Sequence, residues 1–358
     1  MKTYREFLTE AEQDPRIPHP EDSVFQGTAQ AQRYVTALQE IAKNPGSGSI
    51  KWDGMIALYF GRDTSGKFFI NDKYMPETFH AYSPLDWQRY DTEIKRSRTA
   101  RPDLYKKIAA IWPGLEAAVG NTPGVFKGDL MFVGPLEPVN GAYVFQPVTV
   151  RYAVDVNSEL GKLIAGRRAL IVAHQFQDAP FTGKSFGNDQ VTVIPPSMGI
   201  KFTLRVPGSL VVQAQKTVSG AAAQAIDKFL SGLPKTVQES IKKYFNHRAT
   251  GQTSLDITEW LKANVSAKQS ANLLAPDGYM QSNAAGYQAL AKAWQSIATL
   301  KEALIQQLES QIKGISQTIN GRPGGEGFVF PTSVGMIKLV SKGNFGAAHF
   351  SGFAAQKK

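Results

Sequence analysis

A lysine and an aspartate lie two residues apart in an apolar stretch of the chain, and a glycine directly follows the aspartate. They are Lys51, Asp53 and Gly54, within residues 49–60. Residues i and i+2 of a strand point to the same face, so a strand here would project the ammonium and the carboxylate together. Gly54 would let a ligand or another backbone come close. A buried lysine loses its proton more readily and can act as a nucleophile. A surface hairpin carrying an ion pair is the alternative.

Two more acids and one lysine stand in similar apolar surroundings further along the chain. Asp129 lies in the strand-like run 125–132, Glu326 directly precedes another such run, and Lys338 lies in a third, 335–340. A buried charge needs hydrogen bonds, a counter-charge or a metal ion as a partner. These positions are therefore candidate binding or catalytic residues.

The Lys-x-Asp-Gly motif that begins at Lys51 resembles the signature of the covalent nucleotidyltransferases, which include ATP-dependent DNA and RNA ligases and mRNA capping enzymes. Segments similar to three later motifs of that family, around Asp129, Glu326 and Lys338, follow in the family's order. The chain departs from the family where Asp129 replaces a glutamate and where Val340 replaces a second lysine. A tetrapeptide alone is a weak signal, and the order of the four segments strengthens it.

The resemblance implies that Lys51 attacks the α-phosphorus of ATP and forms a lysyl-AMP intermediate. Asp53 and Gly54 would form part of the nucleotide pocket, and Asp53 would orient either that pocket or Lys51 itself. Lys338 would hold the α-phosphate, with Lys342 as the alternative. The attacking amine must be neutral, and a neighbouring lysine together with partial burial favours that form.

Further roles follow from the same resemblance. Lys73 would deliver a basic group toward the nucleotide, and Asp129 would face the sugar and the metal. Glu326 would help to hold Mg²⁺ or Mn²⁺, since hard cations prefer oxygen ligands. Tyr152 or Phe176 would stack on the purine. A solvated strand-end lysine and two ordinary core aromatics are the alternatives for Lys73 and for the two rings.

The implied activity is ATP-dependent joining of 5′-phosphate and 3′-hydroxyl ends of DNA or RNA by a monomer. No arginine follows the motif where DNA ligases have one, which favours an RNA-ligase-like or divergent phage member. A non-catalytic, basic nucleic-acid-binding protein inside a phage head is the alternative. A GTP-using capping enzyme is a third interpretation, which the short segment after Lys338 disfavours.

Composition agrees with a polyanionic partner. The 358-residue chain has a formal net charge of +10, and it has no cysteine, which excludes disulfides and thiolate metal sites. It has no apolar run of about 18 residues and no secretory signal, so we expect no membrane span and a location in the host cytoplasm. The histidines are scattered, and His174 is expected to be a core residue.

The predicted fold is α+β: an antiparallel-sheet nucleotidyltransferase domain, of the ATP-grasp-like ligase adenylation type, with an inserted α-helical bundle. The expected parts are an N-terminal segment 1–26, a first part of the nucleotidyltransferase domain 27–206, the helical insertion 207–320 and a C-terminal part 321–358. Composition changes sharply after residue 207, where Ala, Gln, Lys and Leu begin to dominate.

Finer boundaries follow from periodicity. The last helix of the insertion is expected over 282–319, and a further strand is expected over 199–206. The first eleven residues read as a short amphipathic helix. They resemble the targeting peptide of phage internal head proteins, which a prohead protease cuts after a glutamate, here Glu10. The chain is then expected to be packaged inside a phage head.

Overall fold

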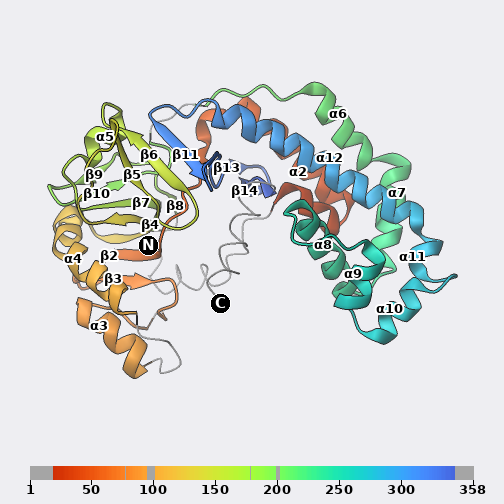
Figure 1. The fold of residues 1–358 in the computed structure, drawn as a ribbon, viewed down its shortest axis with the longest axis horizontal. Helices are drawn as coiled ribbons and strands as arrows, with labels where there is room; N and C mark the ends of the chain where they lie inside the picture. Colours follow the sequence, from red (N-terminus) through yellow and green to blue (C-terminus); the bar gives the residue numbers. More distant parts are fainter. Residues whose placement is uncertain (1–18, 77, 95–100, 178, 199–201, 343–358) are drawn as a thin grey trace. The chain divides into compact units, whose positions relative to one another are not determined.

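The structure is a computed structural model of the whole chain. It describes residues 19–76, 78–94, 101–177, 179–198 and 202–342. The expected helix over 1–11 and the cleavage point after Glu10 lie outside these residues. The fold is mixed α+β with mainly antiparallel sheets, as the sequence predicts (Figure 1).

The described part of the chain divides into two compact units. The first contains the described residues of 50–200 and 312–325, and the second contains those of 19–49, 202–311 and 326–342. Residues 27–49 and 326–342 thus group with the helical region, whereas the expected organisation placed them in the sheet domain.

The first unit is organised around a seven-stranded sheet. Its strand order is β3-β2-β4-β7-β10-β9, with β8 paired to β7. All neighbours are antiparallel except β7 and β10, which run parallel. The strands are β2 (Ala57–Arg62), β3 (Phe68–Asp72), β4 (Gly124–Val133), β7 (Ala169–Phe176), β8 (Ala179–Pro180), β9 (Phe186–Gly187) and β10 (Val191–Ile194).

Helices between β3 and β4 cover this sheet and close its core. They are α3 (Pro84–Arg89), the π-helical turn η3 (Tyr90–Ile94) and α4 (Pro102–Val119). Large side chains of these helices, including Trp87 and Trp112, pack on apolar residues of the sheet. Burial of this apolar area is the main force that holds the helices to the sheet.

A smaller sheet of order β12-β11-β6-β5 completes the first unit, together with α5 (Glu159–Ile164). The helix expected over 282–319 ends at Glu309, and Ile315 and Ile319 lie in β11 instead. That expectation was wrong because a four-residue spacing puts side chains on one face of a strand as well as of a helix. Gly314, with φ of 74°, precedes the strand. The strands are β5 (Ala142–Phe145), β6 (Arg151–Asp155), β11 (Ile315–Ile319) and β12 (Arg322–Pro323).

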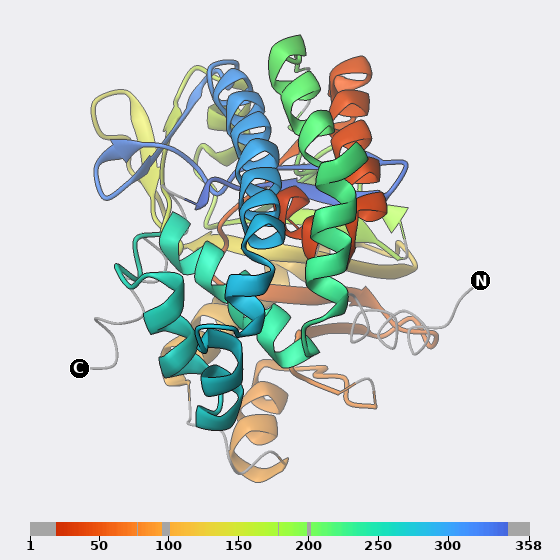
Figure 2. The same cartoon turned by 90° about the vertical axis from the view of Figure 1, so that its right-hand side faces the viewer.

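The second unit is mainly helical. Its longest helix, α12, packs against α6 and α7, and α2 packs against α6, so that these helices lie side by side (Figure 2). Asp256 and Glu259 form a capping box at the start of α9. The helices are η1 (Pro20–Gln26), α2 (Thr28–Lys43), η2 (Pro45–Ser47), α6 (Gly208–Thr217), α7 (Gly220–Ser231), α8 (Lys235–Ala249), α9 (Ile257–Asn264), α10 (Ala267–Leu274), α11 (Tyr279–Ser282) and α12 (Ala284–Glu309).

A small sheet of order β1-β13-β14 includes the hairpin of the second unit. The hairpin strands are β13 (Phe328–Thr332) and β14 (Gly335–Leu339), and Ser49 belongs to β1 (Ser49–Ile50). Residues 202–206 form no strand, so the strand expected over 199–206 is absent from its described part. Among the described helices, none combines the length and apolar character of a membrane span.

Candidate functional site

The loop after Lys51 is not the continuous strand that the sequence predicts. Strand β1 ends at Ile50 and β2 starts at Ala57, so Lys51 and Asp53 do not share a strand face. The N–H of Met55 donates to the carbonyl of Leu130 (2.8 Å), which ties the end of the loop to β4. The loop is therefore a short irregular connection between two strands.

Asp53 fixes this loop from inside the protein. The residue is 7% exposed, and its carboxylate accepts hydrogen bonds from the N–H groups of Thr149 (2.6 Å) and Val150 (2.8 Å). Its own N–H donates to the hydroxyl of Tyr152 (2.8 Å). These contacts hold the loop that carries Lys51, and the two roles expected for Asp53, toward the nucleotide pocket or Lys51 itself, stay predictions.

The two aromatics expected to stack on a purine are already packed. Tyr152 is fully buried, and its ring stacks on Trp52 and Phe145 with centroids 5.2 Å apart in each case. The prediction for Tyr152 was wrong, because its ring is part of the core and its hydroxyl holds the loop. Phe176 is half-buried and packs on Phe126 at 4.5 Å, which is the core role left open for it.

Asp129 pairs with a histidine that the sequence places in the core. The Nε2 atom of His174 lies 2.8 Å from Oδ2 of Asp129, and both side chains are partly exposed. On β7, Ala173 pairs with Gly128 and Gln175 pairs with Lys127, so His174 is the extra residue of a β-bulge. A bulge re-aims a side chain, which alternation along the strand does not predict.

Charges around Asp129 keep it ionised. Burial alone would raise its pKa, but His174, Lys51 and Lys127 together outweigh burial and lower the pKa below its ordinary value. The charge of Lys51 thus acts directly on Asp129. Lys51 and Asp129, both predicted site residues, are therefore close enough to interact electrostatically within the first unit.

Gly54 allows β4 to approach the loop. A Cβ atom at this position would overlap the Cβ of Asp129 and lie 3.0 Å from its Cγ. The expected close approach at Gly54 is confirmed, and the neighbour is the candidate acid itself.

We expect Gly54→Ala to destabilise the first unit by about 1–3 kcal/mol, because β4 or the loop must move to make room. Chemical denaturation of the two proteins measures this difference. Gly46→Ala is the control, because a Cβ at Gly46 meets no atom within 4 Å. Equal stability of the two variants would contradict the packing argument.

A cavity of about 490 Å³ opens beside this loop. Gly54, Lys73 and Asp129 line it, so three predicted residues share one cavity. Sequence reasoning did not single out its aromatic and cationic residues Tyr74, Arg101 and Lys107, because none of them belongs to a motif. The remaining lining residues are Met55, Ile56, Ala57, Tyr74, Arg101, Leu104 and Lys107.

The other predicted residues belong to the second unit. Glu326 precedes β13 and Lys338 lies on β14, and both are half-buried. Lys342 is buried, and its ammonium lies 2.8 Å from Glu21 and 3.0 Å from Asp22. The alternative role for Lys342 as a phosphate ligand was wrong, because two carboxylates already pair with it.

No group of three or more His, Asp or Glu side chains is gathered as a metal-ligand set among the residues that the structure describes. This observation does not bear on a nucleotide-bound metal, because Mg²⁺ in such sites uses one or two carboxylates together with substrate phosphates and water. The ionised Asp129 carboxylate, on a cavity wall, is an oxygen donor that suits a hard cation.

Comparison with models of known protein families identifies the family of this chain. A family model matches residues 15–353, which is nearly the whole chain. The chain belongs to the family of unknown function DUF6267. No curated protein and no solved structure matches it. Functional arguments for this DUF6267 member therefore rest on its own residues.

Proposed function

We propose that this DUF6267 protein is an ATP-dependent polynucleotide ligase that acts through a lysyl-AMP intermediate at Lys51. The observation that carries the proposal is the arrangement of the Lys-x-Asp-Gly loop. Asp53 anchors the loop, Gly54 packs on Asp129, and the charge of Lys51 acts on that acid beside a cavity. A motif match alone would not require these contacts.

The chemistry follows from the residue types. The neutral amine of Lys51 would attack the α-phosphorus of ATP; a P–N bond would form as the P–O bond to pyrophosphate breaks, and the amine would lose a proton. A 5′-phosphate would then attack the AMP phosphorus as the P–N bond breaks and Lys51 regains its proton. A 3′-hydroxyl would lose its proton, bond to the activated 5′-phosphorus and release AMP, which seals the strand. A Mg²⁺ or Mn²⁺ ion, for which Asp129 would supply an oxygen ligand, would offset charge on the phosphates.

The order of segments along the chain also supports the proposal. Glu326 and Lys338 flank and occupy the β13–β14 hairpin, and β1 belongs to the same sheet. Lys51 follows β1 directly in the sequence. The proposed roles of Glu326 and Lys338, toward the metal and the α-phosphate, rest on this order of segments.

A non-catalytic nucleic-acid-binding protein is the second candidate, which would be packaged inside a phage head. The contacts of Lys342 favour this second candidate. Val340 replaces the second lysine of the family's last motif, and Lys342, which could have substituted for that lysine, is paired with Glu21 and Asp22. The net charge of +10 suits either function.

One experiment separates the two candidates. The protein is incubated with Mg²⁺ and ATP labelled at the α-phosphate, and the denatured protein is then tested for covalent label that survives alkali and is released by acid, as expected for a P–N bond to lysine. Label is expected for the ligase, and nucleic-acid binding without label would leave the second candidate. GTP in place of ATP tests the capping-enzyme chemistry in the same assay.

A further inference from the structure

Two cations and one exposed ring meet in the cavity beside the Lys51 loop. Tyr74 is 53% exposed and lines the cavity together with Lys73 and Lys107. In the part of the chain that the structure describes, no carboxylate forms an ion pair with either lysine. The ammonium of Lys107 lies 3.3 Å from the sulfur of Met55, and that of Lys73 lies 5.0 Å from the centre of the Tyr74 ring.

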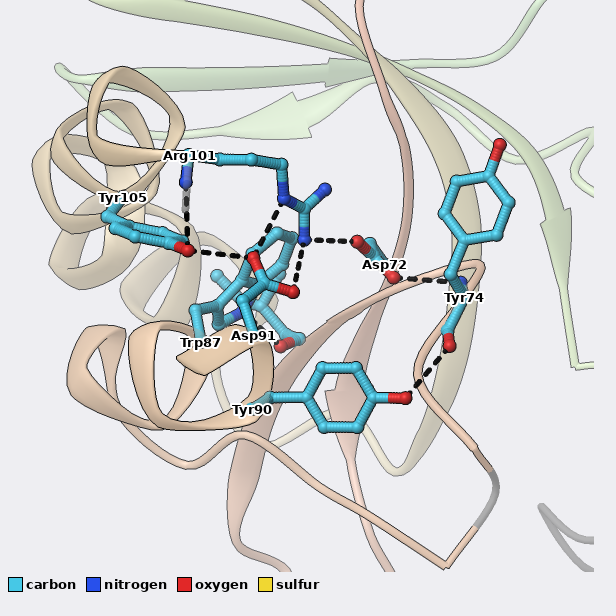
Figure 3. Close-up of polar contacts among 8 residues, drawn as sticks. Asp72, Tyr74, Trp87, Tyr90, Asp91, Arg101 and Tyr105 are labelled. Atoms are coloured by element: carbon cyan, nitrogen blue, oxygen red, sulfur yellow. Dashed lines mark hydrogen bonds and ion pairs between the residues drawn. The ribbon is translucent and has the colours of Figure 1, made fainter. Parts of the chain in front are cut away.

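The main chain of Tyr74 is held on both sides. Its N–H donates to Oδ1 of Asp72 (2.8 Å), and its carbonyl accepts the hydroxyl of Tyr90 (3.1 Å). Figure 3 shows that the Tyr74 ring points away from Tyr90 and from the polar cluster. An exposed side chain on a loop normally samples many orientations, and these two bonds restrict its backbone.

A buried charge network supports Asp72 in turn. Arg101 donates Nη2 to Asp72 (2.8 Å) and Nε to Asp91 (2.8 Å), and both aspartate side chains are fully buried (Figure 3). Tyr105 donates its hydroxyl to Asp91 (2.8 Å). Charges buried in this way cost desolvation energy and are weak evidence for stability. Such a network does, however, place the groups that it contacts accurately.

We propose that Tyr74 is a stacking platform for a nucleobase and that Lys73 and Lys107 bind the adjoining phosphates. An aromatic ring accepts any base, and ammonium groups bind phosphate with little regard to sequence. This deepens the proposed function, because it names the group that recognises the nucleotide in place of the buried Tyr152. The ligand chemistry is a base with its phosphate, supplied either by ATP or by the 5′ end of a polynucleotide.

Binding without Mg²⁺ tests the platform separately from the chemistry. Affinities for ATP, for a short 5′-phosphorylated single strand and for inorganic triphosphate are measured by calorimetry. We expect Tyr74→Ala to weaken binding of ATP, of the strand, or of both by about 5- to 150-fold, and to leave triphosphate binding unchanged because triphosphate has no base. Tyr74→Phe, which keeps the ring, should recover most of the loss.

Three further variants provide contrast. Lys107→Met should weaken all the ligands that bind, triphosphate included, and should reduce the salt dependence of binding. Lys106→Met removes an exposed lysine of the same helix that does not line the cavity, and Leu85→Ala removes an exposed apolar side chain of α3. Both should bind like the unmodified protein.

The outcomes distinguish ATP from a polynucleotide as the source of the base, and they test the stacking platform separately from the ligase activity. If Tyr74→Ala weakens the binding of only one of the two ligands, ATP or the single strand, that ligand is the source of the base. Wild-type affinity in Tyr74→Ala, equal weakening of triphosphate binding, or no binding by the unmodified protein would overturn the platform. Tyr74-dependent binding without covalent label would retain the platform and reject the ligase. Covalent label with unchanged Tyr74→Ala binding would do the reverse.

Discussion

Lys51→Arg is expected to reduce covalent labelling by ATP to background. Arginine keeps the positive charge that acts on Asp129, but its guanidinium stays protonated in proteins and has no lone pair suited to attack on phosphorus. The substitution therefore removes the nucleophile and leaves the neighbouring electrostatics largely in place. Electrophoresis after incubation with α-labelled ATP and Mg²⁺ measures the loss.

Lys106→Arg is the matched control, because Lys106 is an exposed lysine of the same unit and lies outside the cavity lining. It should label like the unmodified protein. Peptide mapping should place the AMP on Lys51. Undiminished label in Lys51→Arg, or label mapped to a different residue, would exclude Lys51 as the nucleophile.

Glu21→Gln is expected to destabilise the second unit by about 3–5 kcal/mol. The carboxylate of Glu21 is fully buried and lies 2.6 Å from the ammonium of Lys301 and 2.8 Å from that of Lys342. These contacts tie η1 to α12 and to the segment after β14. The amide keeps the shape of the side chain but leaves Lys301, which is 1% exposed, without its counter-charge. Chemical denaturation measures the difference.

A surface pair and a double variant provide the controls. Glu239→Gln removes an exposed carboxylate 3.8 Å from Lys242 and should cost no more than about 1 kcal/mol. Glu21→Leu combined with Lys301→Met removes both buried charges and should recover part of the loss. A Glu21→Gln protein as stable as Glu239→Gln would contradict the role given to this cluster.

The same cluster predicts a dependence on pH. Burial alone would raise the pKa of Glu21, but Lys301 and Lys342 outweigh burial and lower it well below the ordinary value of 4.5. Because the folded-state pKa is the lower one, the stabilisation is present above about pH 4.5 and is lost as the pH falls. The Glu21→Gln variant should lack this part of the acid destabilisation.

Local patterns predicted most of the elements. Apolar runs located β2, β4, β13 and β14, and helical spacing located α12, which ends at Glu309. These predictions succeed because each strand or helix must bury one face, which leaves a period in the sequence. The period failed at Ile315 and Ile319, whose spacing suits both kinds of element.

The residue types at the candidate site were also readable from the chain. Lys51, Gly54 and Asp129 stood out because charge or glycine interrupts an apolar run, and the structure brings these three together in the first unit. The place of Glu326 and Lys338 in the site remains a prediction, which rests on the order of the segments.

Only the tertiary structure decided how these residues are used. The sequence by itself determined the α+β class, the basic charge and the apolar settings of its candidate charges. A β-bulge turned His174 toward Asp129, packing buried Tyr152, and contacts between distant segments paired Lys342 with Glu21. The hydrogen bonds that hold the main chain of Tyr74 likewise join residues from separate elements. Such contacts depend on which surfaces meet in three dimensions, and no local period or spacing encodes that.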